Sequence, residues 1–219
     1  MPLKTIILGT LGYVFEYRRI LLRVLLVPFV LYMALDTISL YKQDWVAKLL
    51  LSVLSLMVQT IFAITTHRVM LLGPQSVPSW GVLSWSRREM LFALHIIGLA
   101  LIAMPFAFFT FIPMVGWLLT AASIIWITGR LSLVFPLIAI DQHVTFKDSW
   151  QLTRRHQALM IFVVMVFPIA LMSPVYLLRL LPYSFVLTSF FTTLTTVFTV
   201  TALSVAYKYI RISTDTPSA

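Results

Sequence analysis

The stretch MLFALHIIGLALIAMPFAFFTFIPMVGWLLTAASIIWITG, from Met90 to Gly129, contains 40 consecutive residues without a charged side chain. About 20 apolar residues cross the hydrocarbon layer of a bilayer, so this run is long enough to cross twice. Pro113 and Gly116 lie within it, and both residue types favour a turn. The stretch therefore predicts a hairpin of two transmembrane helices.

The composition places the rest of the chain in the same class. Of its 219 residues, 60% are hydrophobic and 11% are charged, and the mean hydropathy is +0.98. A water-soluble domain of this size could not bury so much apolar surface in one core. We predict an all-α polytopic membrane protein with six transmembrane helices as three hairpins. The spans are expected at about 20–40, 46–66, 89–110, 112–129, 158–180 and 184–207.

A pair of arginines precedes each predicted hairpin. The pairs are Arg18-Arg19, Arg87-Arg88 and Arg154-Arg155, spaced 69 and 67 residues apart. Such a period indicates a single integral membrane domain, residues 1–219, built from three repeats at about 1–75, 76–143 and 144–213. Because each unit has an even number of spans, the units are expected to be parallel, around a pseudo-threefold axis along the membrane normal.

The basic residues also predict the orientation of the chain. They gather before span one, between spans two and three, between spans four and five, and after span six. Basic loops stay in the cytoplasm, so both termini are expected there. Eight arginines are expected to contact lipid headgroups and to anchor this topology: Arg18, Arg19, Arg68, Arg87, Arg88, Arg130, Arg154 and Arg155.

The net charge of +9 and the isoelectric point of about 10.2 indicate an anionic partner. Anionic lipid attracts Lys and Arg beside the membrane by about 1 kcal/mol each. Nucleic acid is the competing partner, but the basic residues lie scattered at helix ends without interleaved aromatic side chains. We therefore expect membrane phospholipids, and no nucleic acid.

Each hairpin is preceded by a short segment with amphipathic character, at residues 3–17, around Trp80 and Trp85, and at 146–157. In the third segment Thr145 and Asp148 have the spacing of a helix-capping pair. Helices with aromatic and basic residues are suited to the headgroup layer. Ordinary cytoplasmic helices that pack on the bundle explain these segments equally well.

Three short stretches resemble a known family. RLSLVFPLIAID (130–141) and TFKDSWQLTR (145–154) are similar to the glycerophosphoryl diester phosphodiesterase membrane-domain-like proteins and the related YciC-like family, and HRVMLLGP (67–74) matches more weakly. The resemblance implies a multi-helix domain of the bacterial inner membrane without assigned chemistry. In the fused relatives, hydrolysis belongs to a separate soluble barrel domain, so that activity is not expected from this chain.

The residues themselves give no sign of an enzyme. Seven carboxylates and four histidines are present, without an HExxH, a GxSxG or a phosphate-binding glycine loop. Asp141, His143, Asp148 and His156 lie close in sequence, but their spacing fits no metal-site pattern and Asp148 already suits a cap. We expect no catalytic residues, no metal site and no cofactor.

Polar side chains inside the spans are the remaining candidates, because they are costly in hydrocarbon. Asp36 and Arg179 lie near the ends of spans one and five, where they could form a pair or be solvated at the interface. Solute-path candidates are Gln59, His95, Thr188, Thr192, Thr195 and Thr199. Hydrogen bonding between helices, or to a helix's own backbone, explains such residues as well.

Two functions follow from these observations. The first is a non-catalytic membrane protein that organises membrane or serves as an accessory subunit, with another membrane-protein subunit as a second candidate partner besides lipid. The alternative is a small transporter or channel with a pathway between the hairpins. The absence of a paired, deeply placed ionisable residue from the sequence favours the first, because ion-coupled transport usually needs one.

Overall fold

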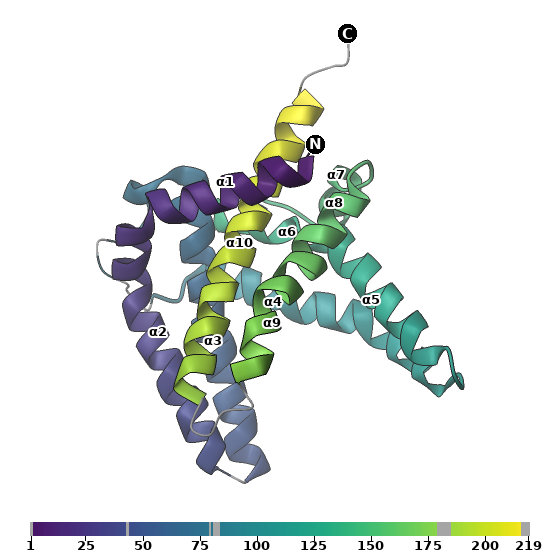
Figure 1. The fold of residues 1–219 in the computed structure, drawn as a ribbon, viewed down its shortest axis with the longest axis horizontal. Helices are drawn as coiled ribbons and strands as arrows, with labels where there is room; N and C mark the ends of the chain where they lie inside the picture. Colours follow the sequence, from purple (N-terminus) through teal and green to yellow (C-terminus); the bar gives the residue numbers. More distant parts are fainter. Residues whose placement is uncertain (1, 43, 79, 81–83, 179–184, 216–219) are drawn as a thin grey trace.

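The computed structural model describes residues 2–42, 44–78, 80, 84–178 and 185–215, and every regular element in these ranges is helical (Figure 1). The α-helices are α1 (Pro2–Glu16), α2 (Arg18–Tyr41), α3 (Trp45–Leu72), α4 (Arg87–Ala103), α5 (Gly116–Leu131), α6 (Val134–Ala139), α7 (Phe146–Leu152), α8 (Gln157–Ile161), α9 (Phe167–Leu178) and α10 (Phe185–Asp215). Short 3-10 helical segments occupy Pro74–Ser76 and Met104–Phe111, and a π-helical segment occupies Phe162–Val166.

Six helical segments are long and apolar enough to cross a bilayer. They are Arg18–Tyr41, Trp45–Leu72, Arg87–Phe111, Gly116–Ala139, Gln157–Tyr176 and Leu187–Thr214. The all-α polytopic membrane fold predicted from the sequence is confirmed. The largest boundary error concerns the fourth span, expected to end at 129, whose helical segment continues to Ala139 because Val134, Leu137 and Ile138 are buried against the protein. The second and sixth spans continue past residues 66 and 207, to Leu72 and Thr214.

Consecutive spans pack on each other as three hairpins (Figure 1). The first hairpin (α2 and α3) and the third (α8 to α10) join through the contact of α3 with α10. The second hairpin, α4 to α5, projects away from that bundle in the view of Figure 1. Within the apolar part of Arg87–Phe111 only 11% of the residues are buried, against 50% for Leu187–Thr214. The threefold repeat itself stays a prediction.

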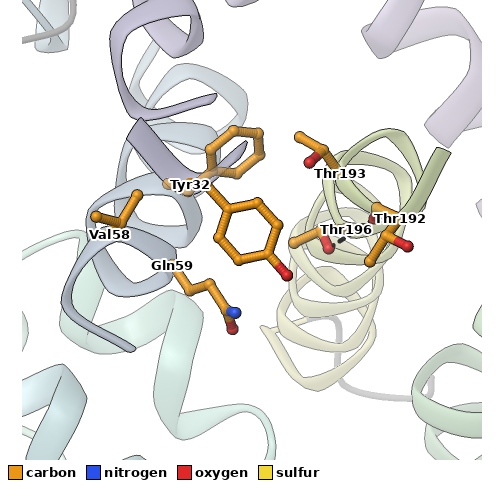
Figure 2. A pocket seen from close by; sticks show the side chains of 7 residues that line it. Tyr32, Val58, Gln59, Thr192, Thr193 and Thr196 are labelled. Atoms are coloured by element: carbon orange, nitrogen blue, oxygen red, sulfur yellow. Dashed lines mark hydrogen bonds between the residues drawn. The ribbon is translucent and has the colours of Figure 1, made fainter. Parts of the chain in front are cut away.

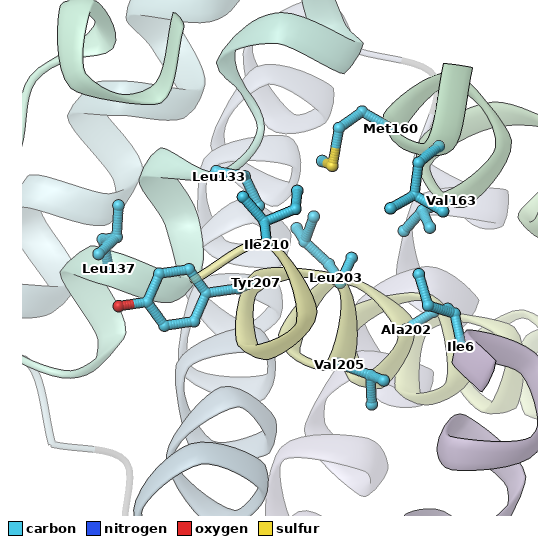
Figure 3. Packing of buried hydrophobic residues seen from close by; sticks show 12 residues of the cluster. Ile6, Leu133, Leu137, Met160, Val163, Ala202, Leu203, Val205, Tyr207 and Ile210 are labelled. Carbon is cyan, nitrogen blue, oxygen red and sulfur yellow. The ribbon is translucent and has the colours of Figure 1, made fainter. Parts of the chain in front are cut away.

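The chain gathers its short helices at one end of the bundle, which we call the basic end. Here α2 and α4 begin, α3, α5 and α10 end, and α1, α6 and α7 lie (Figure 1). A large apolar cluster lies at this end and surrounds α10 (Figure 3). It includes Ile6 of α1, Leu133 before α6, Met160 of α8, and Leu203 and Ile210 of α10. The packing of α10 is therefore fixed mainly at the basic end.

Helix α1 crosses α10 at close range. Ile6 and Thr10 on its inner face are buried, while Leu8 and Phe15 on its outer face are exposed. A Cβ atom added to Gly9 would lie 3.2 Å from Cγ1 of Val205, whereas one added to Gly12 meets nothing within 4 Å. Glycine at position 9 therefore lets the two helices approach. The predicted amphipathic segment is a helix with one face on the bundle and an apolar outer face.

Replacement of Gly9 by leucine should loosen α1. Both Gly9→Leu and Gly12→Leu raise helix propensity by about 1 kcal/mol, so their difference isolates packing. Overpacking against Val205 should cost about 1–3 kcal/mol and lower the thermal midpoint of the purified protein. It should also speed tryptic cleavage at Lys4. Equal thermal midpoints for the two variants would contradict the close contact.

Candidate functional site

One face of α10 carries a polar side chain at almost every turn, and we call it the α10 polar face. Its members are Ser189, Thr193, Thr196, Ser204 and Lys208. Spacings of three or four residues place side chains on one side of a helix, and Val200 is the single apolar interruption. This face meets α2, α3 and α1, so the polar groups lie between helices rather than toward lipid.

At the end opposite the basic end, the hydroxyl of buried Ser189 donates to Oδ2 of half-buried Asp36, at 2.6 Å. Asp36 belongs to α2, five residues before its end at Tyr41. No basic side chain in the described ranges forms an ion pair with it. The suggested partner Arg179 lies outside the described residues. Among the described residues, one neutral hydroxyl therefore holds a carboxylate that lies within a span.

One turn further into the bundle, α2, α3 and α10 enclose a partly open cavity of about 90 Å³ (Figure 2). Its lining consists of Tyr32, Val58, Gln59, Phe62, Thr192, Thr193 and Thr196. The hydroxyls of Thr193 and Thr196 donate to the carbonyls of Ser189 and Thr192, at 2.9 and 3.0 Å. A hydroxyl has only one proton, so these two oxygens can only accept hydrogen bonds from whatever occupies the cavity.

An apolar layer closes the cavity toward the basic end. Phe62 lines the cavity and also packs in a buried cluster with Val197, Val69 and Met70. The next polar member of the face, Ser204, follows Thr196 by eight residues, which is about 12 Å of helix. The cavity is therefore a pocket in this structure and not part of a continuous polar path.

Beyond that layer, Nδ1 of His67 lies 2.7 Å from Oγ of Ser204, and both side chains are buried. Because the Ser204 hydroxyl donates to the carbonyl of Val200, the proton between the two side chains is assigned to Nδ1 of the imidazole. Lys208, one turn on, donates to the carbonyl of Met70 at 2.7 Å. These contacts hold the ends of α3 and α10 together.

The structure brings only part of the predicted path together. Gln59 and Thr192 line the cavity. His95 lies in the second hairpin instead, 2.8 Å from the carbonyl of Leu91 and packed on Phe146. Thr188, Thr195 and Thr199 lie outside the lining, and the hydroxyls of Thr188 and Thr199 are buried without a hydrogen-bond partner in the described structure. Thr193 and Thr196, which line the cavity, lie on a stripe of α10 next to the one predicted from the sequence.

Two of the arginines predicted as anchors tie helices together. Nη1 of Arg68, near the end of α3, lies 2.6 Å from Oδ2 of Asp141, and Nη1 of Arg88, at the start of α4, lies 3.2 Å from the same carboxylate. Asp141 has a positive φ of 61°, so it does occupy a turn. Arg68 also donates to the carbonyl of Ala139. Asp141 thus joins the first hairpin to the second.

Arg130 is a correction to the anchor prediction. Its side chain is buried, with the guanidinium 4.3 Å from the centre of the Trp150 ring. Its carbonyl accepts hydrogen bonds from the hydroxyls of Ser149 and Thr153, at 2.9 and 3.0 Å. Protein, not lipid, therefore surrounds this residue. By contrast Arg18, Arg19, Arg87, Arg154 and Arg155 are exposed.

The acidic and histidine residues at 141–156 do not converge. Asp141 binds the two arginines, and Asp148 caps α7 by accepting from the hydroxyl and the amide of Thr145, both at 2.7 Å. These hydrogen bonds lower the pKa of Asp148, and the bond from the Thr145 hydroxyl has the largest effect. His156 lies 3.3 Å from the Ser213 hydroxyl. Within the described ranges no three such residues are placed to hold a metal ion.

Comparisons with protein-family models, with curated proteins and with solved structures found no match to this chain. The family resemblance of residues 67–74, 130–141 and 145–154 therefore stays a prediction. These three stretches nevertheless form one contact network at the basic end. Arg68 of the first binds Asp141 of the second, and Arg130 of the second lies on Trp150 of the third.

Ser204→Ala should destabilise the protein. The substitution leaves Nδ1 of buried His67 without a partner, which costs about 1–3 kcal/mol. Thr201→Val is the matched control, because Thr201 is fully buried one turn away and its hydroxyl has no partner in the described structure. Thermal unfolding in one detergent should show a clear loss for Ser204→Ala alone. A similar loss of thermal stability in both variants would mean that packing around α10, rather than the His67–Ser204 hydrogen bond, causes the loss.

Proposed function

We propose that the chain is a non-catalytic multi-pass protein of the bacterial inner membrane that organises membrane or serves as an accessory subunit of a membrane complex. Its basic end would face the cytoplasm and hold anionic phospholipid. The observation that carries this proposal is a set of exposed arginines without carboxylate partners in the described structure. They are Arg18, Arg19, Arg87, Arg154 and Arg155.

Their placement favours lipid phosphate as the partner. Arg18 and Arg19 are the first residues of α2, Arg87 is the first of α4, and Arg154 and Arg155 precede α8. Each therefore stands where an apolar span begins, at the level expected of the headgroups. Phosphates there attract each arginine by about 1 kcal/mol. The resemblance of residues 130–154 to an inner-membrane family supports the same location.

The second hairpin supports the accessory-subunit part of the proposal. The rest of the chain buries only a small share of its first span. Large apolar side chains such as Leu101, Phe108 and Trp117 are exposed. In a bilayer this surface contacts lipid or another membrane-protein subunit. It is held to the bundle at its base, where Arg88 reaches Asp141.

A small transporter is the second candidate, because Gln59 and Thr192 do line a cavity. The apolar layer of Phe62 and Val197 stands between this cavity and the basic end. Transport would require α10 to move relative to α3. The lipid-binding function needs no such rearrangement, so we place it first.

Removal of four exposed arginines should weaken binding of anionic lipid. The variant combines Arg18→Gln, Arg19→Gln, Arg154→Gln and Arg155→Gln. Each arginine contributes about 1 kcal/mol of attraction to lipid phosphate, and salt screening reduces this contribution. Phosphatidylglycerol retention should therefore fall at least about tenfold. Mass spectrometry of co-purified lipid measures this. Lys42→Gln with Lys48→Gln, both exposed at the opposite end, is the control. Unchanged retention in the quadruple variant would refute the proposal.

The cytoplasmic placement of the basic end has its own test. The chain contains no cysteine, so single cysteines can be introduced at the exposed residues Lys42 and Gln142, at opposite ends. A membrane-impermeant maleimide should label Lys42→Cys in intact cells. It should label Gln142→Cys only after permeabilisation. The reverse pattern would place the basic end outside.

A further inference from the structure

We propose that the cavity between α2, α3 and α10 binds a small organic ammonium group, carried either by a lipid headgroup or by a free amine. The cavity lies toward the end opposite the exposed arginines, and its lining contains no basic residue. The inference therefore stands apart from the anionic-lipid function proposed above.

The first argument is the charge of Asp36. It follows Tyr32 by four residues on α2, so it lies one turn from the cavity on the same helix face. At five residues from the end of α2 it is about 7.5 Å inside the span. Carboxylates at such positions are costly unless a positive charge compensates them, and Asp36 has only the Ser189 hydroxyl in the described structure. A bound cation supplies the missing compensation.

The second argument is hydrogen-bond polarity. Thr193 and Thr196 have already donated their protons to the α10 backbone, so their oxygens accept only. The Tyr32 hydroxyl points into the same space beside Gln59 (Figure 2). A primary ammonium has three donors and no acceptor, which matches the two threonine oxygens. The Gln59 amide and the hydroxyls of Tyr32 and Thr192 can also donate, but a carboxylate or phosphate ligand would lie near the negative charge of Asp36.

The third argument is size and shape. A volume of about 90 Å³ corresponds to about three water molecules in the liquid, at about 30 Å³ each. That suffices for an ammonium group and a short carbon chain. The rings of Tyr32 and Phe62 line the cavity, and aromatic faces attract organic cations. Val58 and Phe62 offer apolar contact to the attached carbons.

The route of entry follows from exposure around the cavity. Val58 and Phe62 are buried, whereas Gln59 is exposed. Phe62 and Val197 close the opposite side. A ligand therefore enters past Gln59, either from the lipid beside the bundle or from the nearer aqueous surface. A lipid headgroup and a free amine carry the same ammonium group, and experiment can distinguish them.

The free-amine arm uses the purified full-length protein in detergent. Ethanolamine should raise its thermal midpoint in a saturable manner, whereas ethylene glycol, which replaces the ammonium by a hydroxyl, should not at equal concentration and ionic strength. The lipid arm uses native mass spectrometry after exchange into mixed phosphatidylethanolamine and phosphatidylglycerol. Preferential retention of phosphatidylethanolamine assigns the lipid source, and an ethanolamine effect without this preference assigns the free amine.

Substitutions in and near the cavity test whether the ammonium group binds there. Asp36→Asn keeps an acceptor for Ser189 but removes the charge, and should weaken the effect at least about tenfold, the equivalent of 1.4 kcal/mol. Thr193→Val should weaken it severalfold, and it keeps the test decisive should Asp36→Asn fold poorly. Thr199→Val, on the same helix outside the lining, should change nothing. The proposal is overturned when neither probe binds, when ethylene glycol acts equally, or when binding survives both cavity variants.

Discussion

Hydrocarbon offers no hydrogen-bond partner, and this constraint determines how α10 sits in the bundle. Its polar face must turn toward protein, where Asp36, His67 and the end of α3 receive it. Once that face meets α2 and α3, Leu203 and Ile210 turn into the apolar cluster with α1 and α8. Helix α10 contacts both helices of the first hairpin, and also α9 of its own hairpin. Its rotation therefore sets the arrangement of two hairpins.

The second hairpin obeys the same constraint with a different result. Its spans carry few polar groups that need a protein partner, so little holds them against the bundle. What attaches it lies at its base, where Asp141 joins Arg68 to Arg88 and Trp150 lies on Arg130. These charged groups, together with the buried cluster that contains Phe92 of α4 and Ile64 of α3, connect the hairpins at the basic end. The remaining apolar side chains of α4 and α5 are left open to lipid or another subunit.

This division explains what the sequence could and could not predict. Span number and approximate position depend on local hydropathy, which a single sequence contains. The position of the α10 polar face does not, because residues 188, 192, 195 and 199 and residues 189, 193 and 196 both have helical spacing, and neighbouring helices decide which set meets α2 and α3. Two serines, Ser189 and Ser204, lie on the face that contacts α2 and α3. The burial of Arg130 depends on Trp150, a contact between α5 and α7 that sequence spacing does not reveal.

The two ends of the protein differ in the charge that they attract. The basic end presents five exposed arginines without carboxylate partners in the described structure, and the other end presents Asp36 and a cavity in which Thr193 and Thr196 accept hydrogen bonds. About 12 Å of helix with apolar packing separates that cavity from His67, so no chain of side-chain hydrogen bonds connects the two ends through the described residues. Coupling between them would pass through α10 as a rigid body, since Ser189, Ser204 and Lys208 share one face and a rotation of the helix breaks their contacts with α2 and α3 together. A ligand that favours one rotation would then change the packing of α10 on α1 at the basic end.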